Sequence, residues 1–182
     1  VLADKYEKTK DYVYDSSFKD NLKIKRFAGI KFLRKRKKIS ALKKILETKQ
    51  VTCVIGDSWK SFELSINILN TLSITSICLA HGNEIIPKNF FYKKRLSSTL
   101  NKVSHIVCNS NYTKNLVIKT GVKNKSITII YPGAQNNINL QEKTISNLNG
   151  SPIITTLARL EKRKGHSHIL SAIAKLKKEH SN

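Results

Sequence analysis

Short apolar runs alternate with amphipathic helical stretches along most of this 182-residue chain. Most of the runs are almost continuously apolar, which is typical of parallel strands that are buried on both faces. Regular alternation of strand and helix favours a doubly wound α/β sheet. The expected strands are 22–26, 51–56, 76–80, 105–109, 127–131 and 153–157, and the expected helices are 31–48, 58–72, 91–102, 112–120 and 166–178.

The two ends of the sequence predict a piece of a longer protein, truncated at both ends. The chain contains no Met, Val1 to Asp4 read as the tail of a strand, and no strand pattern follows the last helix. The stretch 135–150 is polar, rich in Asn and without a clear period, so it is predicted to be a linker. The expected organisation is a Rossmann-like domain over 1–134 that lacks its first strand, followed by the beginning of a second domain over 151–182.

Three cysteines, Cys53, Cys78 and Cys108, each lie inside an apolar run, and the sequence has no CxxC pair. Buried free thiols in a reducing compartment fit this pattern better than disulfides, and no His and Cys residues have the spacing of metal ligands. No apolar run approaches the ~20 residues that span a bilayer. The formal net charge of +22 indicates attraction to a polyanion, which can be nucleic acid, an anionic membrane or a phosphorylated ligand.

Polar or turn residues follow four successive predicted strands. Asp57, His81, Ser110 and Gly133 each come where such a strand ends. In an open parallel sheet, ligands bind outside the carboxyl ends of the strands. We therefore expect these four residues to share one edge of the sheet and to form a binding cleft.

Structural roles are open for several of these residues. His81 is equally placed to cap backbone groups at its strand end. Trp59, the single Trp, fits either the acceptor side of the cleft beside Asp57 or a position in the core. Ser110 is in place to be the N-cap of the next helix, a role that is compatible with a ligand contact.

A basic loop from Ala158 to Gly165 precedes the last predicted helix. Free backbone N–H groups, the helix dipole and the charges of Arg159 and Lys164 favour a bound phosphate at such a junction. The alternative is a charged surface loop on a basic protein.

Four segments resemble motifs of the large retaining glycosyltransferase family called GT4, which has the GT-B fold, and they occur in the family's order. Each segment is weakly specific, but the order and the spacing make the combination strong. The resemblance covers nearly all of this chain, which in turn covers only part of the family's length. The segments are His81-Gly82-Asn83-Glu84, the helix start from Ser110 to Thr113, Pro132-Gly133, and Arg159-Leu160 with Lys164-Gly165.

The resemblance implies that the whole protein moves a sugar, with retention, from a nucleotide diphosphate to a carbohydrate or lipid-linked acceptor. It implies that His81 lies beside the transferred sugar, that Gly82 allows close backbone approach and that Glu84 orients this loop. It assigns the donor diphosphate to Arg159, Lys164 and Gly165.

The family's chemistry needs neither a metal nor a protein nucleophile, so no cofactor beyond the donor sugar is expected. The family's Gly-rich loop and its Glu-x7-Glu segment are not in this sequence. We therefore expect these 182 residues to be catalytically silent on their own.

The predicted helix 31–48 carries the basic run Arg34-Lys35-Arg36-Lys37-Lys38. This run is either an ordinary solvated face or a patch that binds anionic lipid. The lipid-linked acceptors of several family members fit the second alternative, and they suggest a cytoplasmic protein at the inner face of a membrane. Residues at helical spacing are expected to pack on the sheet, namely Ala28, Phe32, Ile39, Leu42 and Leu46.

Two other functions stay open on the sequence alone. One is a basic nucleic-acid-binding protein, and the other is a non-catalytic Rossmann-like interaction module. The basic residues are spread over several helices without a set of aromatic residues for stacking, which makes nucleic acid the less favoured partner.

Overall fold

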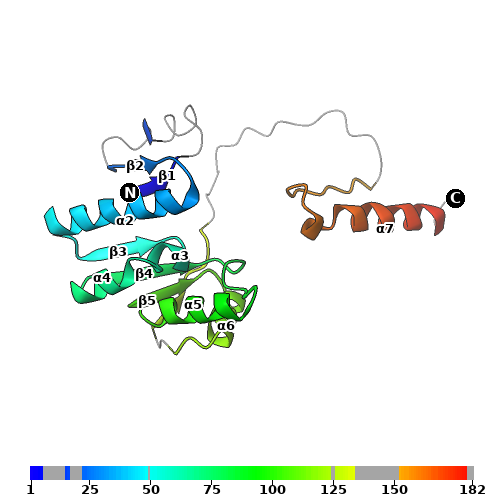
Figure 1. The fold of residues 1–182 in the computed structure, drawn as a ribbon. Helices are drawn as coiled ribbons and strands as arrows, with labels where there is room; N and C mark the ends of the chain where they lie inside the picture. Colours follow the sequence, from blue (N-terminus) through cyan, green and yellow to red (C-terminus); the bar gives the residue numbers. More distant parts are fainter. Residues whose placement is uncertain (6–14, 17–21, 49, 124–125, 134–151, 180–182) are drawn as a thin grey trace. The chain divides into compact units, whose positions relative to one another are not determined.

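The computed structural model describes residues 1–5, 15–16, 22–48, 50–123, 126–133 and 152–179 (Figure 1). The chain forms two compact units, Val1–Ala134 and Gln135–Asn182, and each is described by itself. The predicted linker 135–150 lies outside the described residues.

The described part of the first unit forms two β-sheets, and the strand pairings in both are parallel. β1 (Leu2–Asp4) pairs with β2 (Lys25–Phe27), and a second sheet runs in the order β3-β4-β5-β6. The predicted α/β class with a parallel sheet is confirmed. The strands of the second sheet are β3 (Cys53–Gly56), β4 (Thr75–Ala80), β5 (His105–Cys108) and β6 (Ile127–Ile129).

Helices follow the strands and cover the sheets. α2 (Lys31–Thr48) has the predicted boundaries and packs against β1 and β2. α5 (Phe90–Leu100) and α6 (Asn111–Lys119) each begin one residue earlier than predicted. In both cases the side chain of the preceding residue, Asn89 or Ser110, accepts a hydrogen bond from the backbone in the first turn and so fixes the helix start.

The predicted helix 58–72 is two short helices, α3 (Trp59–Phe62) and α4 (Ile66–Thr71). The backbone N–H of Ser65 donates to the carbonyl of Phe62, three residues back, and this turn interrupts the α-helical ladder. The buried side chains still recur at helical spacing across the break. Because the apolar period is preserved, the sequence pattern predicted one helix where there are two.

The core of the first unit lies around β4 and β5. β4 lies inside its sheet, between β3 and β5. Along this strand, buried residues alternate with half-buried ones, and the buried residues are Ser76, Cys78 and Ala80. Side chains from the surrounding helices and loops complete the core, and removal of their apolar surface from water is the main source of stability. The fully buried apolar residues include Phe62, Leu69, Ile85, Leu96, Leu100, Ile106 and Val117.

The three cysteines are free, and two of them are buried as predicted. Burial raises the pKa of the Cys78 thiol to about 12 and that of the Cys108 thiol to about 11. Both groups are therefore neutral and unreactive near pH 7. The prediction that Cys53 is buried is wrong, because β3 is an edge strand and leaves Cys53 exposed.

The described residues of the second unit, 152–179, form a turn of 3-10 helix, η1 (Lys162–Lys164), and α7 (His166–Glu179). The predicted strand 153–157 is wrong. Residues 152–160 are all exposed, and no strand lies within the described residues of this unit, 152–179. A strand needs a neighbour for its backbone hydrogen bonds, so an apolar run without one stays extended and unpaired.

Candidate functional site

The carboxyl ends of β3, β4, β5 and β6 bring the predicted site residues of the first unit to one edge of the sheet. The parallel register pairs Gly56 with Cys78 and Ala80 with Cys108, so consecutive strands end near one another. Asp57 follows β3 and His81 follows β4. Both are exposed to solvent, where a ligand can reach them.

His81 begins a tight loop that Glu84 closes. The backbone N–H of His81 donates to Glu84 Oε1 over 2.6 Å, and the N–H of Ile85 donates to the Gly82 carbonyl over 2.9 Å. Gly82 has a φ of +111°, and a Cβ there would lie 3.4 Å from Thr113 Oγ1. The loop therefore needs glycine at this position, and the Glu84 carboxylate orients the backbone of His81.

Trp59 supports this loop from the core of the first unit. Its side chain is 1% exposed, and its indole Nε1–H donates to the Glu84 carbonyl over 3.0 Å. The Tyr92 hydroxyl donates to the same carbonyl over 2.7 Å, and the Trp59 and Tyr92 rings meet edge to face. Of the two roles that the sequence left open, the core position is correct, and the cleft-lining role of Trp59 is wrong because its ring is sealed from solvent.

Asn109 joins His81 to α6, and the sequence prediction missed it. Its Nδ2 donates to the His81 carbonyl over 3.3 Å, while its Oδ1 accepts from Thr113 Oγ1 over 2.7 Å. Ser110 Oγ accepts from the N–H of Thr113 over 3.2 Å, so Ser110 is the N-cap of α6 as expected. The position of Asn109 directly after a buried apolar run was the signal available in the sequence.

The remaining predicted residues of this edge are less constrained. Asp57 Oδ1 accepts from Ser61 Oγ over 2.8 Å at the start of α3. Gly133 is exposed, and nothing lies within 4 Å of a Cβ built on it. Tyr131, two residues earlier, was not predicted, and its hydroxyl accepts from Asn111 Nδ2 over 3.2 Å.

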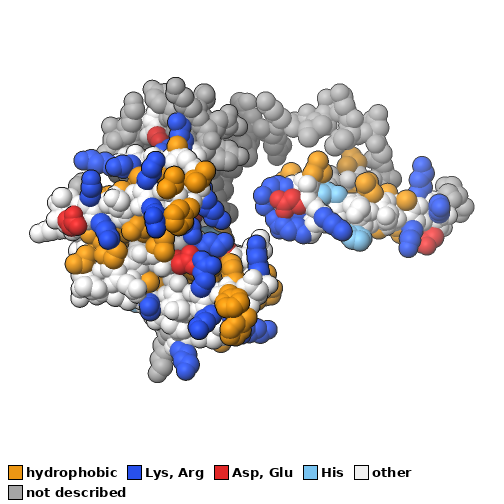
Figure 2. Space-filling model, in the orientation of Figure 1, with side chains coloured by type: hydrophobic (Ala, Val, Ile, Leu, Met, Phe, Trp, Pro, Cys, Tyr) orange, Lys and Arg blue, Asp and Glu red, His pale blue; other side chains and the backbone are white. Residues whose placement is uncertain are grey.

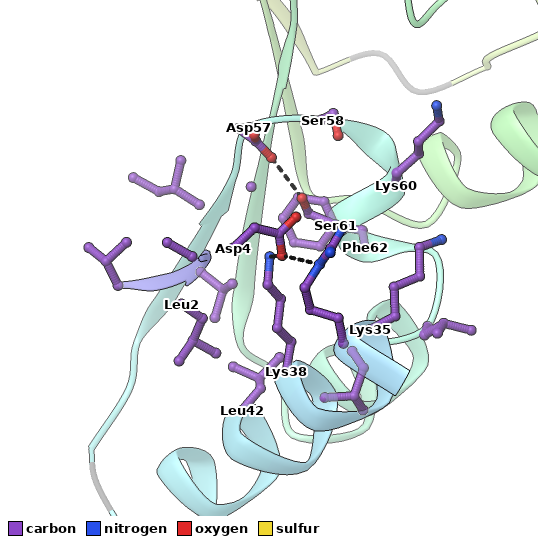
Figure 3. A pocket seen from close by; sticks show the side chains of 18 of the residues that line it. Leu2, Asp4, Lys35, Lys38, Leu42, Asp57, Ser58, Lys60, Ser61 and Phe62 are labelled. Carbon is purple, nitrogen blue, oxygen red and sulfur yellow. Dashed lines mark hydrogen bonds and ion pairs between the residues drawn. The ribbon is translucent and has the colours of Figure 1, made fainter. Parts of the chain in front are cut away.

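A cavity of about 890 Å³ separates β1 from β3 (Figure 3). All of β1 and all of β3 line it, together with apolar side chains of α2 such as Ile39 and Leu42. In the described part of the chain, β1 pairs only with β2 and β3 only with β4. The cavity is therefore bounded by two strands that each have an edge without a partner strand.

The polar end of this cavity changes the interpretation of the basic run on α2. Lys38 Nζ lies 2.6 Å and Arg34 Nε lies 3.0 Å from Asp4 Oδ1, and Figure 3 shows Lys38 directed at Asp4. Burial alone raises the pKa of Asp4, but the hydrogen bonds and charges of Lys38 and Arg34 outweigh it and hold that pKa below its ordinary value. Lys35 in turn pairs with Glu63 over 3.4 Å.

Three of the five residues proposed as a lipid-binding patch therefore form ion pairs within the first unit. Of the other two, Lys37 is exposed, and the guanidinium of Arg36 lies 4.4 Å from the centre of the Phe32 ring. Phe32 itself is 59% exposed, so the prediction that it packs on the sheet is wrong. Ala28 is exposed as well, whereas the expected Ile39, Leu42 and Leu46 are half-buried. Ala41, which lies between Ile39 and Leu42, is the buried residue of α2.

The basic loop of the second unit forms a compact turn before α7. Arg159 pairs with Glu161 over 3.0 Å, and Arg163 pairs with the same carboxylate over 2.6 Å. Gly165, with a φ of +72°, ends η1 and allows the chain to enter α7. The His166 ring lies 2.9 Å from the Arg159 carbonyl through Nε2, a contact that sequence reasoning missed.

Arg159 and Lys164 are both exposed, as a phosphate-binding role requires. Within the described residues, no three side chains of His, Cys, Asp or Glu gather closely enough to hold a metal ion. None of the helices in the described ranges is both long enough and apolar enough to cross a bilayer.

A parallel sheet with polar loops at its carboxyl edge defines the first unit as a Rossmann-like α/β domain. The family model described as Glycosyltransferase Family 4 matches residues 5–135, and the chain therefore belongs to glycosyltransferase family 4. This match contains the His81, Ser110 and Pro132-Gly133 segments and ends before the Arg159 loop, and it confirms the family resemblance.

Two further comparisons bear on the chain. A search of curated proteins found no match. Among solved structures, the crystal structure of Anabaena HepE in complex with UDP is similar, with a TM-score of 0.52 and 12% sequence identity. The similarity covers 73% of this chain and 43% of the HepE chain, so the chain spans less than half of that structure. At this identity the likeness concerns the fold, and it agrees with one Rossmann-like half of a GT-B enzyme.

Proposed function

We propose that this chain is the acceptor-side part of an enzyme that transfers a sugar from a nucleotide diphosphate to a carbohydrate or lipid-linked acceptor, with retention. Membership of glycosyltransferase family 4 and the fold shared with a UDP-bound protein support the transfer reaction. One observation carries the site. His81 is exposed at the carboxyl edge while Glu84, Trp59 and Asn109 hold the backbone of its loop in place.

In this proposal the exposed His81 contacts the transferred sugar, while Gly82, which is buried beside Thr113, shapes the loop that carries it. A hydrogen-bonding side chain on a rigid loop is suited to this task, because its geometry does not have to be organised during the reaction. Asp57, Ser110 and Gly133 lie around the same edge and contribute to the wall of the cleft. Glu84 acts through the loop as a positioning residue, since its carboxylate already binds the His81 N–H.

The donor diphosphate is assigned to the exposed loop of the second unit. Arg159 and Lys164 supply positive charge there, and Gly165 lets the loop enter a helix N-terminus. These features favour a bound phosphate and stabilise the charge that develops on the leaving diphosphate. Retention requires no protein nucleophile in this scheme, so the residues named here act by binding, orientation and charge.

Replacing His81 with alanine is expected to lower kcat/KM for sugar transfer by about 10- to 100-fold in the full-length enzyme. This range corresponds to the loss of one hydrogen bond worth about 1.5–3 kcal/mol in the transition state. His105→Ala is the matched control, because His105 is also exposed but begins β5 at the opposite edge, beside Ser126. Equal kinetics for His81→Ala and the wild-type enzyme would contradict the role of His81.

The cavity between β1 and β3 supports the second part of the proposal, that the domain contains one more strand. A segment of the full-length polypeptide outside residues 1–182 enters the cavity and pairs with β1 on one side and β3 on the other. The two sheets then become one, which removes two unpaired edges and buries the apolar wall of α2. A parallel strand also needs a crossover connection to the rest of the domain.

Thiol labelling tests this strand directly, because Cys53 is exposed and lines the cavity. We expect Cys53 to react with a maleimide at least about tenfold more slowly in the full-length protein than in the 182-residue chain, since covered side chains open only by local unfolding. Cys78 and Cys108 are the internal controls and should be protected in both proteins. Equal reactivity of Cys53 in the two proteins would show that the cavity stays open.

A further inference from the structure

Large apolar side chains are exposed where the loop after His81 enters α5. Phe90 is 73% exposed, Phe91 is 76% exposed and Ile86 is 46% exposed. The two phenyl rings meet edge to face, with their centres 6.0 Å apart. In Figure 2, exposed apolar side chains and basic ones lie side by side on the part of the first unit that carries α5. We call Ile86, Phe90 and Phe91 the aromatic patch.

The backbone under the aromatic patch is firmly held. Asn89 Oδ1 accepts from the N–H of Tyr92 over 2.8 Å, and Tyr92 is tied to the Glu84 carbonyl. Ile85 and Leu96 are fully buried on either side of the patch. The phenyl rings therefore project from a fixed helix start, and their exposure is a property of the folded domain.

Positive charge surrounds the aromatic patch and is not neutralised. Lys88, Lys93 and Lys94 are exposed, and within the described residues none of them forms an ion pair. The sequence contains no Asp or Glu between residues 85 and 141. The carboxylates of Glu84 and Glu63 are already engaged, since Glu84 binds the His81 N–H and Glu63 binds Arg95 and Lys35.

We propose that the aromatic patch and its three lysines dock the enzyme on an anionic bilayer, with Phe90 and Phe91 inserted at the level of the lipid headgroups. Exposed aromatic side chains flanked by lysines match both features of such a surface, the apolar acyl boundary and the negative headgroups. The basic run on α2 is the poorer candidate, because Arg34, Lys35 and Lys38 are paired within the domain.

This docking surface deepens the proposed function and rests on it. The aromatic patch begins directly after the loop that Glu84 closes, at the same edge of the sheet as His81. An acceptor whose lipid part lies in the bilayer would therefore present its polar head close to the proposed sugar site. The substrate class that follows is a lipid-linked acceptor.

The test measures binding of the full-length protein to vesicles in the absence of any substrate. The vesicles contain phosphatidylcholine alone or phosphatidylcholine mixed with phosphatidylglycerol. We expect the wild-type protein to bind the mixed vesicles, and the double variant Phe90→Ser with Phe91→Ser to bind them at least about tenfold more weakly. The double variant Lys93→Gln with Lys94→Gln should lose about fivefold per lysine on mixed vesicles and nothing on neutral ones. Phe32→Ser is the matched control, an exposed Phe on α2 whose loss should leave binding unchanged.

Two outcomes would overturn the docking surface. One is unchanged vesicle binding by the Phe90 and Phe91 variant, or an equal loss with Phe32→Ser. The other is a large fall in the melting temperature of the Phe90 and Phe91 variant, which would show that protein covers these rings. Transfer to a water-soluble acceptor without vesicles should be the same in this variant and in the wild type. Absence of transfer in the wild type would reject the proposed function and leave the vesicle result standing.

Discussion

Replacing Arg159 or Lys164 with alanine is expected to lower the rate of sugar transfer by the full-length enzyme about 100- to 1,000-fold. The physical reason is that each removes one preformed positive group from the leaving diphosphate, and a single such group is typically worth about 2.7–4 kcal/mol in the transition state. Folding should be unaffected, because both side chains are exposed and, among the described residues, Arg159 forms its ion pair with Glu161 at the surface. Steady-state kinetics with a nucleotide sugar, alongside thermal unfolding, measure the two effects separately.

Lys177→Ala is the control for this experiment. Lys177 is exposed in the last turn of α7, at the end of the helix that is furthest from the Arg159 loop. It removes the same charge without touching the proposed phosphate site, and it should change the rate by less than about twofold because an exposed charge at a distance is screened. Normal turnover by both Arg159→Ala and Lys164→Ala would remove the diphosphate assignment.

The parallel sheet could be predicted because its strands are short, apolar on both faces and separated by amphipathic helices. The same reasoning placed His81 and Asp57 at one edge, since parallel strands have their carboxyl ends on the same side. It failed for residues 153–157, where an equally apolar run has no neighbouring strand in the described part of its unit. An apolar pattern shows that a segment is able to form a buried strand. Whether it does so depends on a neighbouring strand elsewhere in the fold, which the pattern does not reveal.

The contacts that hold the site could not be predicted, because they join residues that are far apart in sequence and of several chemical kinds. The indole of Trp59 binds a backbone carbonyl 25 positions away, and Arg34 and Lys38 turn toward Asp4 instead of solvent. Hydrophobic periodicity carries no information about such pairs. This is why the sequence offers only a solvated face or a lipid-binding patch for the basic run on α2, and does not predict the ion pairs with Asp4 or the exposure of Phe90 and Phe91.

Truncating Trp59 to alanine is expected to cost about 3–5 kcal/mol of unfolding free energy, the usual penalty for removing a large aromatic side chain from a core. The side chain is 1% exposed and supports both Tyr92 and the Glu84 carbonyl, so the protein cannot refill the space without moving the His81 loop. The loss is measured by urea unfolding of the full-length protein, as the difference in midpoint between the variant and the wild type.

Trp59→Phe separates packing from hydrogen bonding. Phenylalanine keeps much of the buried ring but has no N–H, and the Glu84 carbonyl would still accept from the Tyr92 hydroxyl. Its cost should therefore be closer to about 1 kcal/mol, the usual net worth of one hydrogen bond, plus a smaller packing loss. If Trp59 supports the site as well as the core, the alanine variant should also lose transfer activity under conditions where it remains folded. A loss of less than about 1 kcal/mol for Trp59→Ala would mean that the Tyr92 hydroxyl holds the Glu84 carbonyl without help from the indole, and that Trp59 does not support the His81 loop.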